Sequence, residues 1–233
     1  MADKDTLAEK VADKICVMIS EKGLKPGEKI GTEMELTEQM GVSRSTIREA
    51  IRILISRNVL ESRQGSGTYV SDRKGVIGDP LGLNLLHDKF KLTWDLLEIR
   101  MLLEPQLAYM AATNATEEQL NELRILCDQM EMLSAQRKER SAVDIRFHTV
   151  LLEASGNMVA SNLHPILEKA VEMFIHYTKR EAMPEQMATH REILEGLLRR
   201  DPEWARDMMS MHLAFNRKEL RRVALEQGED LKI

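Results

Sequence analysis

Residues 32–57 read TEMELTEQMGVSRSTIREAIRILISR, and this stretch decides the fold of the first part of the chain. Thr32 and Glu35 have the spacing of a capping box, in which two side chains satisfy backbone N–H groups at the start of a helix. Gly41 suits the left-handed position after a helix, and Ser43 suits the N-cap of a second helix. The stretch therefore predicts two helices joined by a tight turn.

The second of these helices has an apolar face and a polar, basic start. Ile47, Ile51 and Leu54 recur at helical spacing and predict the buried face. The exposed start carries short hydroxyls and arginines, which suit base edges and phosphates of DNA. We predict a recognition helix that enters a major groove by its N-terminal residues. Its candidate DNA contacts are Ser43, Arg44, Ser45, Thr46 and Arg48, with Arg52 placed for phosphate.

A predicted β-hairpin follows the recognition helix directly. Residues 59–63 and 68–70 are short β-prone runs on either side of Gln64-Gly65-Ser66-Gly67. Glycines between two β-runs indicate a turn with positive φ angles. Helix–turn–helix alone also fits an amphipathic helix pair in an ordinary helical protein. The added hairpin favours a wing, with Gly65 and Gly67 allowing close approach to DNA.

The charge of the chain is uneven along its length. The net charge is −5, which by itself does not favour nucleic-acid binding. Residues 43–74, however, hold seven Lys/Arg against three Asp/Glu, and residues 1–75 hold thirteen against twelve. Phosphate contact needs local positive charge rather than a basic whole. A basic N-terminal region followed by an acidic remainder predicts a DNA-binding domain joined to a second domain.

Composition indicates a mainly helical protein of two domains. Aromatic residues make up 4% and there are six prolines in 233 residues. The two cysteines, Cys16 and Cys127, are too few for a disulfide framework, which is compatible with a cytoplasm. We find no signal pattern and no apolar run of membrane length. We expect a winged helix-turn-helix domain over 1–74, a linker with a short helix over 75–91, and an all-α domain over 92–233.

The second domain is predicted as a helical bundle. Thr93 is the expected cap of a long helix with Leu103 turned inward, which Pro105 kinks or restarts. Thr116 and Gln119 have capping-box spacing. Further helices are expected over 81–86, over 141–154 with Ser141 as cap, and over 159–179, 184–200 and 202–226.

Four potential metal ligands occur in this second domain. Asp144 and His148 lie four residues apart and share one helix face, whereas His190 and His212 stand alone on later helices. Three imidazoles and one carboxylate in a bundle core can bind a divalent ion. The pair Asp144/His148 is equally compatible with a helix-surface interaction. Spacing alone leaves both interpretations open.

The first domain resembles the winged-helix domain of the GntR family of bacterial transcription regulators. The resemblance is carried by Leu24-x-Pro26-Gly27, by Gly41-Val42-Ser43-Arg44-x-Thr46-x-Arg48-Glu49-Ala50, and by Gly65-x-Gly67-Thr68-x-Val70. It implies a homodimer on a short palindromic operator with GT and AC arms. One position departs from the family pattern: Met34 stands where members usually carry an arginine. The operator is therefore expected to differ from the family's usual one.

The second domain resembles the FCD effector domain of the FadR subfamily. The matching pieces are Glu98-x-Arg100-x-x-x-Glu104-Pro105, Asp144-x-x-Phe147-His148, Ala154-Ser155-Gly156-Asn157, His190-x-x-Ile193 and Met208-x-x-x-His212-Leu213. The resemblance implies that Asp144, His148, His190 and His212 bind one divalent ion. Zinc, nickel and manganese all accept such ligands. It also implies a small carboxylate effector, such as a sugar acid, with Arg100 as a second anion anchor or as a salt-bridged structural residue.

Three functions are compatible with these features. The first is a dimeric, ligand-responsive transcription regulator, expected to repress a carboxylate-catabolism operon in the cytoplasm. The second is a metal-dependent hydrolase with an appended DNA-binding domain, but the sequence has no glutamate in an HExxH-like arrangement with the ligands. The third is an architectural DNA binder, which leaves the acidic second half unexplained. We expect a regulator, not an enzyme.

Overall fold

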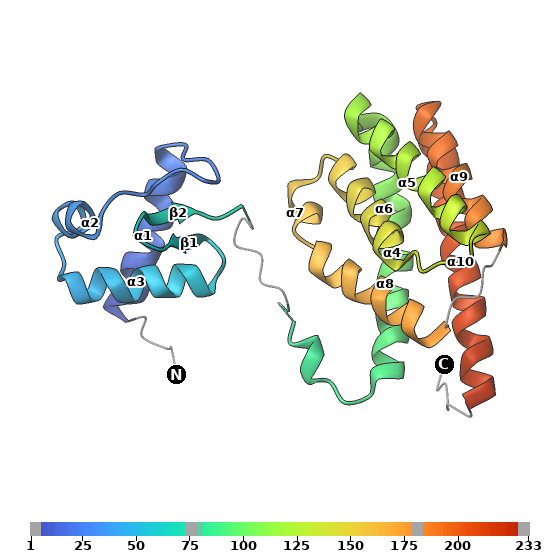
Figure 1. Ribbon diagram of the computed structural model, residues 1–233, viewed down its shortest axis with the longest axis horizontal. Helices are drawn as coiled ribbons and strands as arrows, with labels where there is room; N and C mark the ends of the chain where they lie inside the picture. Colours follow the sequence, from blue (N-terminus) through green and yellow to red (C-terminus); the bar gives the residue numbers. More distant parts are fainter. Residues whose placement is uncertain (1–5, 73–78, 80, 179–183, 228–233) are drawn as a thin grey trace. The chain divides into compact units, whose positions relative to one another are not determined.

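A computed structural model describes residues 6–72, 79, 81–178 and 184–227. The chain divides into two compact units, residues 1–78 and 79–233, and each is described by itself. The described part is mainly helical, with one two-stranded antiparallel sheet in the first unit (Figure 1). The predicted fold class is confirmed. No helix among the described residues is long and apolar enough to cross a membrane.

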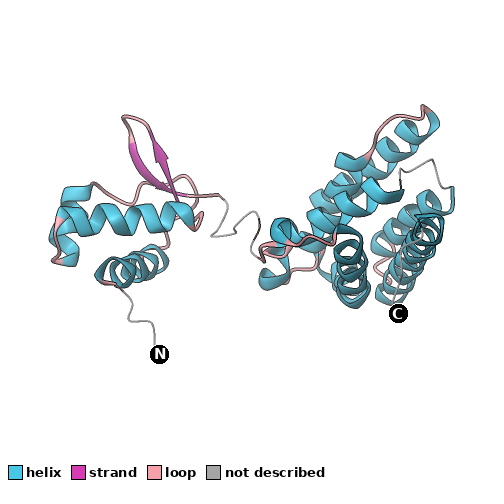
Figure 2. Ribbon diagram, turned by 90° about the horizontal axis from the view of Figure 1, so that it is seen from below, coloured by secondary structure: helices cyan, strands magenta, loops and turns pink. Residues whose placement is uncertain are grey.

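The first unit consists of three helices and a hairpin, which stands out from the helices in Figure 2. Thr6 and Thr32 each form a capping box, and Ser43 accepts a hydrogen bond from the Thr46 backbone N–H. Gly41 ends the second helix with a φ of 66°, as predicted. The elements are α1 (Leu7–Glu21), α2 (Glu33–Met40), α3 (Arg44–Ser56), β1 (Leu60–Arg63) and β2 (Gly67–Val70).

Burial of apolar side chains joins these elements into one small core. Ile47 and Leu54 of α3 are fully buried and pack with Ile15 of α1 and Leu36 of α2. Leu60 on β1 pairs with Val70 on β2, and both contribute to the same core. The hairpin is thus attached by its base, while its tip is left at the surface.

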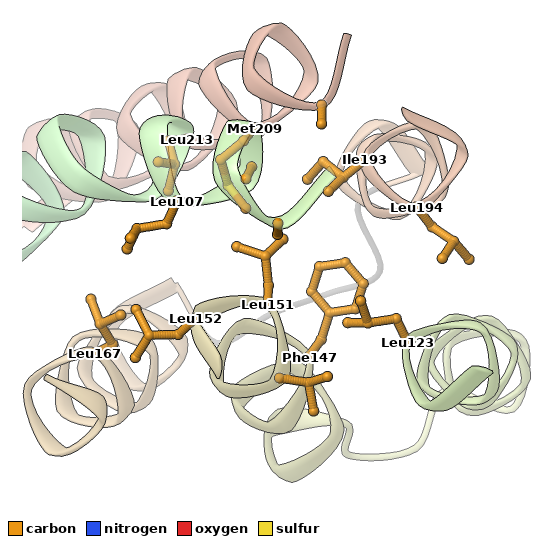
Figure 3. Close-up of a cluster of buried hydrophobic side chains, with 14 of the residues drawn as sticks. Leu107, Leu123, Phe147, Leu151, Leu152, Leu167, Ile193, Leu194, Met209 and Leu213 are labelled. Atoms are coloured by element: carbon orange, nitrogen blue, oxygen red, sulfur yellow. The ribbon is translucent and has the colours of Figure 1, made fainter. Parts of the chain in front are cut away.

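The second unit is a bundle of helices around one large apolar core. In Figure 3, Phe147 and Leu151 of α6 point toward Leu123, Ile193 and Met209, which come from three other helices. The elements are the 3₁₀ helix η1 (Leu83–Leu85), α4 (Lys89–Asn114), α5 (Glu117–Ala135), α6 (Ser141–Ala154), α7 (Met158–Ser161), α8 (His164–Thr178), α9 (Pro184–Leu198) and α10 (Pro202–Gln227).

Helix α4 differs from the prediction at its start and at its proline. Asp88 is the cap, and its carboxylate accepts a hydrogen bond from the Lys91 backbone N–H at 2.9 Å. Thr93 lies inside the helix and donates its hydroxyl to the Lys89 carbonyl at 2.7 Å. The helix continues through Pro105, which is buried. Leu97 before the proline and Leu107 after it are both buried in the core, which holds the two parts of the helix in place.

Three smaller expectations are also corrected. Ser141 is the first residue of α6, and Arg140 occupies the cap position, where its side chain does not cap the helix. The helix predicted over 159–179 is two helices, α7 and α8, because Asn157 caps a single turn that ends at Asn162. Leu103 is 36% exposed rather than inward. Lys179 and residues 73–78, which include the start of the expected linker, lie outside the described residues.

Candidate metal centre and nucleic-acid interface

The start of α3 presents a connected group of hydroxyls. The Ser43 hydroxyl oxygen lies 2.8 Å from the hydroxyl oxygens of both Ser45 and Thr46. Ser43 also caps the helix, so its hydroxyl is held in place. Arg44, which follows directly, is exposed. Helix N-termini with exposed N–H groups and hydroxyls attract phosphate, so this end of α3 can approach DNA.

The other two predicted DNA-contacting arginines already have acidic neighbours. Arg48 Nε lies 3.2 Å from Glu33 Oε1, with side-chain exposures of 66% and 45%. Arg52 Nη1 lies 3.6 Å from Glu49 Oε2. Ion pairs as exposed as these contribute little to stability. Both guanidinium groups are therefore available to exchange a carboxylate for a phosphate.

The wing combines glycines with residues that the sequence reasoning did not single out. Gly65 and Gly67 have φ angles of 70° and 129°. A Cβ on Gly67 would lie 2.6 Å from Cε of Lys29, whose backbone pairs antiparallel with Tyr69 of β2. The Arg63 guanidinium stands over the Tyr69 ring at 4.3 Å. Lys29 is remote from the hairpin in sequence, so no local pattern indicates its place on the wing.

The four predicted metal ligands come together inside the second unit. Asp144 and His148 come from α6, His190 from α9 and His212 from α10, and each is at most 2% exposed. His190 Nε2 lies 2.9 Å from Asp144 Oδ1, and His148 Nε2 lies 3.8 Å from the same oxygen. The His190 and His212 ring centroids are 4.3 Å apart. The interpretation of Asp144/His148 as a surface pair is wrong, because both are buried.

The spacing of these atoms fits a single ion. One ligand atom from each of His148, His190 and His212 can be chosen so that all lie within 4.8 Å of one another. Two atoms bound at about 2.1 Å from one ion lie about 3.0–3.4 Å apart in octahedral or tetrahedral geometry. The observed separations from Asp144 bracket that range. The donor set, imidazoles with a carboxylate, suits a borderline divalent cation.

The electrostatic environment of the cluster favours the neutral form of the His212 imidazole. Burial, followed by the charges of His190 and His148, holds the pKa of His212 well below its usual value. The Thr189 hydroxyl lies 3.0 Å from His212 Nδ1, and the Asn216 amide nitrogen lies 3.2 Å from Nε2. A neutral imidazole has a lone pair to offer, whereas an imidazolium does not. His212 is thus kept neutral, which is the form that an imidazole needs in order to bind a metal ion.

Arg100 combines the two roles that the sequence left open. Its guanidinium forms a buried double hydrogen bond with the Glu104 carboxylate, and Nη2 lies 3.1 Å from His148 Nε2. It is therefore both a salt-bridged residue and a neighbour of the histidine cluster. Glu104 also belongs to this group, because its Oε2 lies 2.9 Å from His148 Nδ1. In the sequence, only its i, i+4 spacing from Arg100 points to it.

The remaining histidines of the second unit lie apart from this cluster. His87 and His176 are exposed. His164 Nδ1 lies 3.2 Å from the Ser161 carbonyl oxygen, at the start of α8. Within the described residues, the cluster of metal-ligating type consists of His148, His190 and His212, with Asp144 beside them.

Comparison with known proteins places both units. Residues 7–70 match the family described as bacterial regulatory proteins, gntR family, and residues 95–215 match the FCD domain. The putative L-lactate dehydrogenase operon regulatory protein of Escherichia coli is 31% identical, covering 97% of this chain and 91% of that protein. The Uxu operon transcriptional regulator of the same species is 28% identical, covering 89% and 86%. A solved Streptococcus agalactiae GntR structure has a TM-score of 0.80 at 38% identity, covering 90% and 99%.

Proposed function

The chain belongs to the GntR family of bacterial regulatory proteins and carries an FCD domain, and from this membership we propose a metal-dependent, carboxylate-responsive repressor. Regulation of transcription is common to the matched relatives. The names of these relatives as operon regulators support the regulator over the hydrolase. The protein would act in the cytoplasm, where its operator DNA lies.

We propose that α3 reads the operator and that the wing adds affinity. Arg44 and Arg48 are the candidate base and phosphate contacts, helped by the hydroxyls of Ser43, Ser45 and Thr46. Arg52 is the candidate phosphate contact on the next turn of the helix. Gly65 and Gly67 would let the wing backbone approach the duplex. Exposure of these arginines and of the wing tip supports the assignment.

A single observation carries the effector part of the proposal: the convergence of a carboxylate and three imidazoles from three helices in a buried position. Asp144, His148, His190 and His212 would hold one divalent ion, whether zinc, nickel or manganese. A bound ion supplies a positive centre with open coordination positions. Those positions would accept a bidentate carboxylate or hydroxy acid.

Arg100 is the proposed second contact for that carboxylate. Its guanidinium lies against His148 and is held by Glu104 inside the unit. Arginine presents donors in a fork that matches a carboxylate. The name of one relative refers to L-lactate, a hydroxy acid that could chelate an ion through its carboxylate and hydroxyl. A small carboxylate of this kind is the effector class that we propose here.

We propose a homodimer that is formed mainly by the second unit. Ile99, Leu102 and Leu103 lie on neighbouring turns of one side of α4 and are 43%, 71% and 36% exposed. Exposed apolar side chains grouped in this way are characteristic of contact surfaces. A two-fold symmetric protein binds a palindromic operator, which agrees with the proposed DNA target.

The test is an operator gel shift with nickel-loaded protein, with and without a panel of small carboxylates. We expect one class of carboxylate to change operator affinity, and to lose this effect when the ion is removed by a chelator. The same compound should also raise the melting temperature. At a hundredfold excess over its Kd, it should increase the free energy of unfolding by about 2.7 kcal/mol. Operator affinity that no carboxylate alters, with or without metal, would contradict the effector proposal.

A further inference from the structure

We propose that Glu104 is a positioning residue for His148. Its carboxylate accepts the Nδ1–H of that imidazole and so directs Nε2 toward Asp144, His190 and His212. This inference rests on the proposed function, because it concerns how the same site holds its ion. Glu104 is not a ligand in this account, and it acts on the ion only through His148.

The contact itself is short, buried and fixed from both sides. Glu104 Oε2 lies 2.9 Å from His148 Nδ1, and both side chains are 2% exposed. Arg100 donates from Nε to Oε1 and from Nη2 to Oε2 of the same carboxylate. A carboxylate held by two parallel hydrogen bonds has little rotational freedom. The oxygen that faces His148 therefore stays in place.

Donor and acceptor rules determine the tautomer of His148. An ionised carboxylate can only accept hydrogen bonds, so Nδ1 of the neighbouring ring must be the donor. A neutral ring that carries its proton on Nδ1 has its lone pair on Nε2. Arg100 Nη2 lies 3.4 Å from Nδ1 and 3.1 Å from Nε2 of the same ring, so its contact does not select between the two tautomers. The carboxylate of Glu104 is therefore the group that specifies the tautomer.

The geometry around Glu104 is that of an ionised carboxylate. The Arg100 guanidinium donates one hydrogen bond to each of its two oxygens and so compensates the negative charge. The tautomer of His212 is less strictly specified, because the Thr189 hydroxyl near its Nδ1 can either donate or accept a hydrogen bond. A fixed carboxylate specifies a ring orientation that a hydroxyl does not.

A simpler role for Glu104 must be separated from this one. The carboxylate also neutralises Arg100, and removing one partner of a buried ion pair leaves an uncompensated charge. A Glu104→Gln variant alone could lose metal through that damage. The double variant Arg100→Gln/Glu104→Leu removes both charges together and leaves no acceptor at position 104, so the net charge around the site is kept and the variant is compared with the wild type.

The first measurement is the nickel affinity of the full chain, by titration against a competing chelator. We expect Arg100→Gln/Glu104→Leu to bind nickel about 10–100-fold more weakly than the wild type, the effect typical of losing an orienting carboxylate. His176→Gln, at an exposed position on α8, serves as a control with wild-type affinity. Equal affinity of the double variant and the wild type would overturn the positioning role.

The second measurement needs no metal. The ¹⁵N chemical shifts of the His148 ring report its tautomer in chelator-treated protein. We expect the Nδ1–H form in the wild type and in Arg100→Gln, and a shift toward the Nε2–H form once Glu104 is replaced. An unchanged tautomer in the double variant would overturn the proposal. If the wild type binds no nickel, the proposed metal function fails, yet these spectra still decide the role of Glu104.

Discussion

Glu33, in the first turn of α2, lies against Arg48 of the recognition helix, with its Oε1 at 3.2 Å from the arginine Nε. The pair connects the two helices of the DNA-binding motif across their exposed side. Both side chains are well exposed, so the pair contributes little to folding. Its main effect is on Arg48, whose charge it partly compensates before DNA arrives.

We predict that Glu33→Gln strengthens operator binding at low salt. The substitution removes one negative charge near the phosphates and frees the Arg48 guanidinium. The gain should be moderate, about tenfold or less, and should shrink as salt rises. Fluorescence anisotropy of a labelled operator at several salt concentrations measures it. Glu38→Gln, also exposed on α2, is the matched control; an equal gain there would assign the effect to net charge alone.

Arg44→Ala should cost about 1–3 kcal/mol of operator binding if Arg44 makes a bidentate contact with a base. The loss should be larger for the operator than for unrelated DNA. Arg57→Ala is the control, because Arg57 lies after α3 and pairs with Asp13 at 3.7 Å. Unchanged operator affinity of Arg44→Ala at matched salt would show that α3 is wrongly assigned as the recognition helix.

Metal content should depend on the clustered histidines and not on the others. We predict that His190→Ala/His212→Ala purifies without its divalent ion, because two of the four ligands are removed. His164→Ala/His176→Ala should keep the wild-type content. Elemental analysis of the proteins, purified side by side, checks this. Equal content in the wild type and His190→Ala/His212→Ala would remove the proposed metal site.

The metal-free protein should lose stability as pH falls through the range of histidine titration. An unfolded histidine takes up a proton near pH ~6.5. Burial holds the pKa of folded His212 well below that value, so the unfolded chain binds more protons. The loss should approach about 1.4 kcal/mol per pH unit below that point. Urea unfolding from about pH 8 to about pH 5 measures it. His212→Gln should flatten the slope, and His87→Gln should not.

Leu102→Glu should weaken the proposed dimer without unfolding the protein. Leu102 is 71% exposed on α4, so a charge there costs little in a monomer but is unfavourable in an apolar interface. Sedimentation velocity of the full chain should show a shift toward monomer, together with weaker operator binding. Leu225→Glu, at a 77% exposed position on α10, is the control. A dimer that tolerates Leu102→Glu would place the interface elsewhere.

Two predicted helix caps, each of which depends on only a few residues, are confirmed. Thr32 with Glu35 and Thr116 with Gln119 form the predicted capping boxes. A cap needs only its own turn of helix, so distant residues rarely override it. The prediction that Thr93 caps α4 was wrong, because Asp88 provides a capping side chain earlier in the sequence. Burial of Phe90 favours extension of the helix back to Asp88.

Long-range features were predictable only in part. The histidines could be singled out by type and by resemblance, but their separation in space depends on how α6, α9 and α10 pack. The contact between Glu104 and His148 joins residues 44 positions apart, and no periodicity specifies it. Lys29 at the wing is a similar case, since its neighbour Gly67 belongs to a different element. Tertiary packing decides such contacts.

The distribution of the candidate ligands over three helices has a consequence for protein synthesis. His190 and His212 are translated 46 and 68 residues after Asp144. A growing chain therefore presents Asp144 and His148 as a two-ligand pair long before the others exist. Two ligands hold a divalent ion far more weakly than four, so we expect capture to follow the packing of α10. When metal is scarce, we therefore expect the chain to fold in nearly the usual amount. The folded protein would then respond less to its effector.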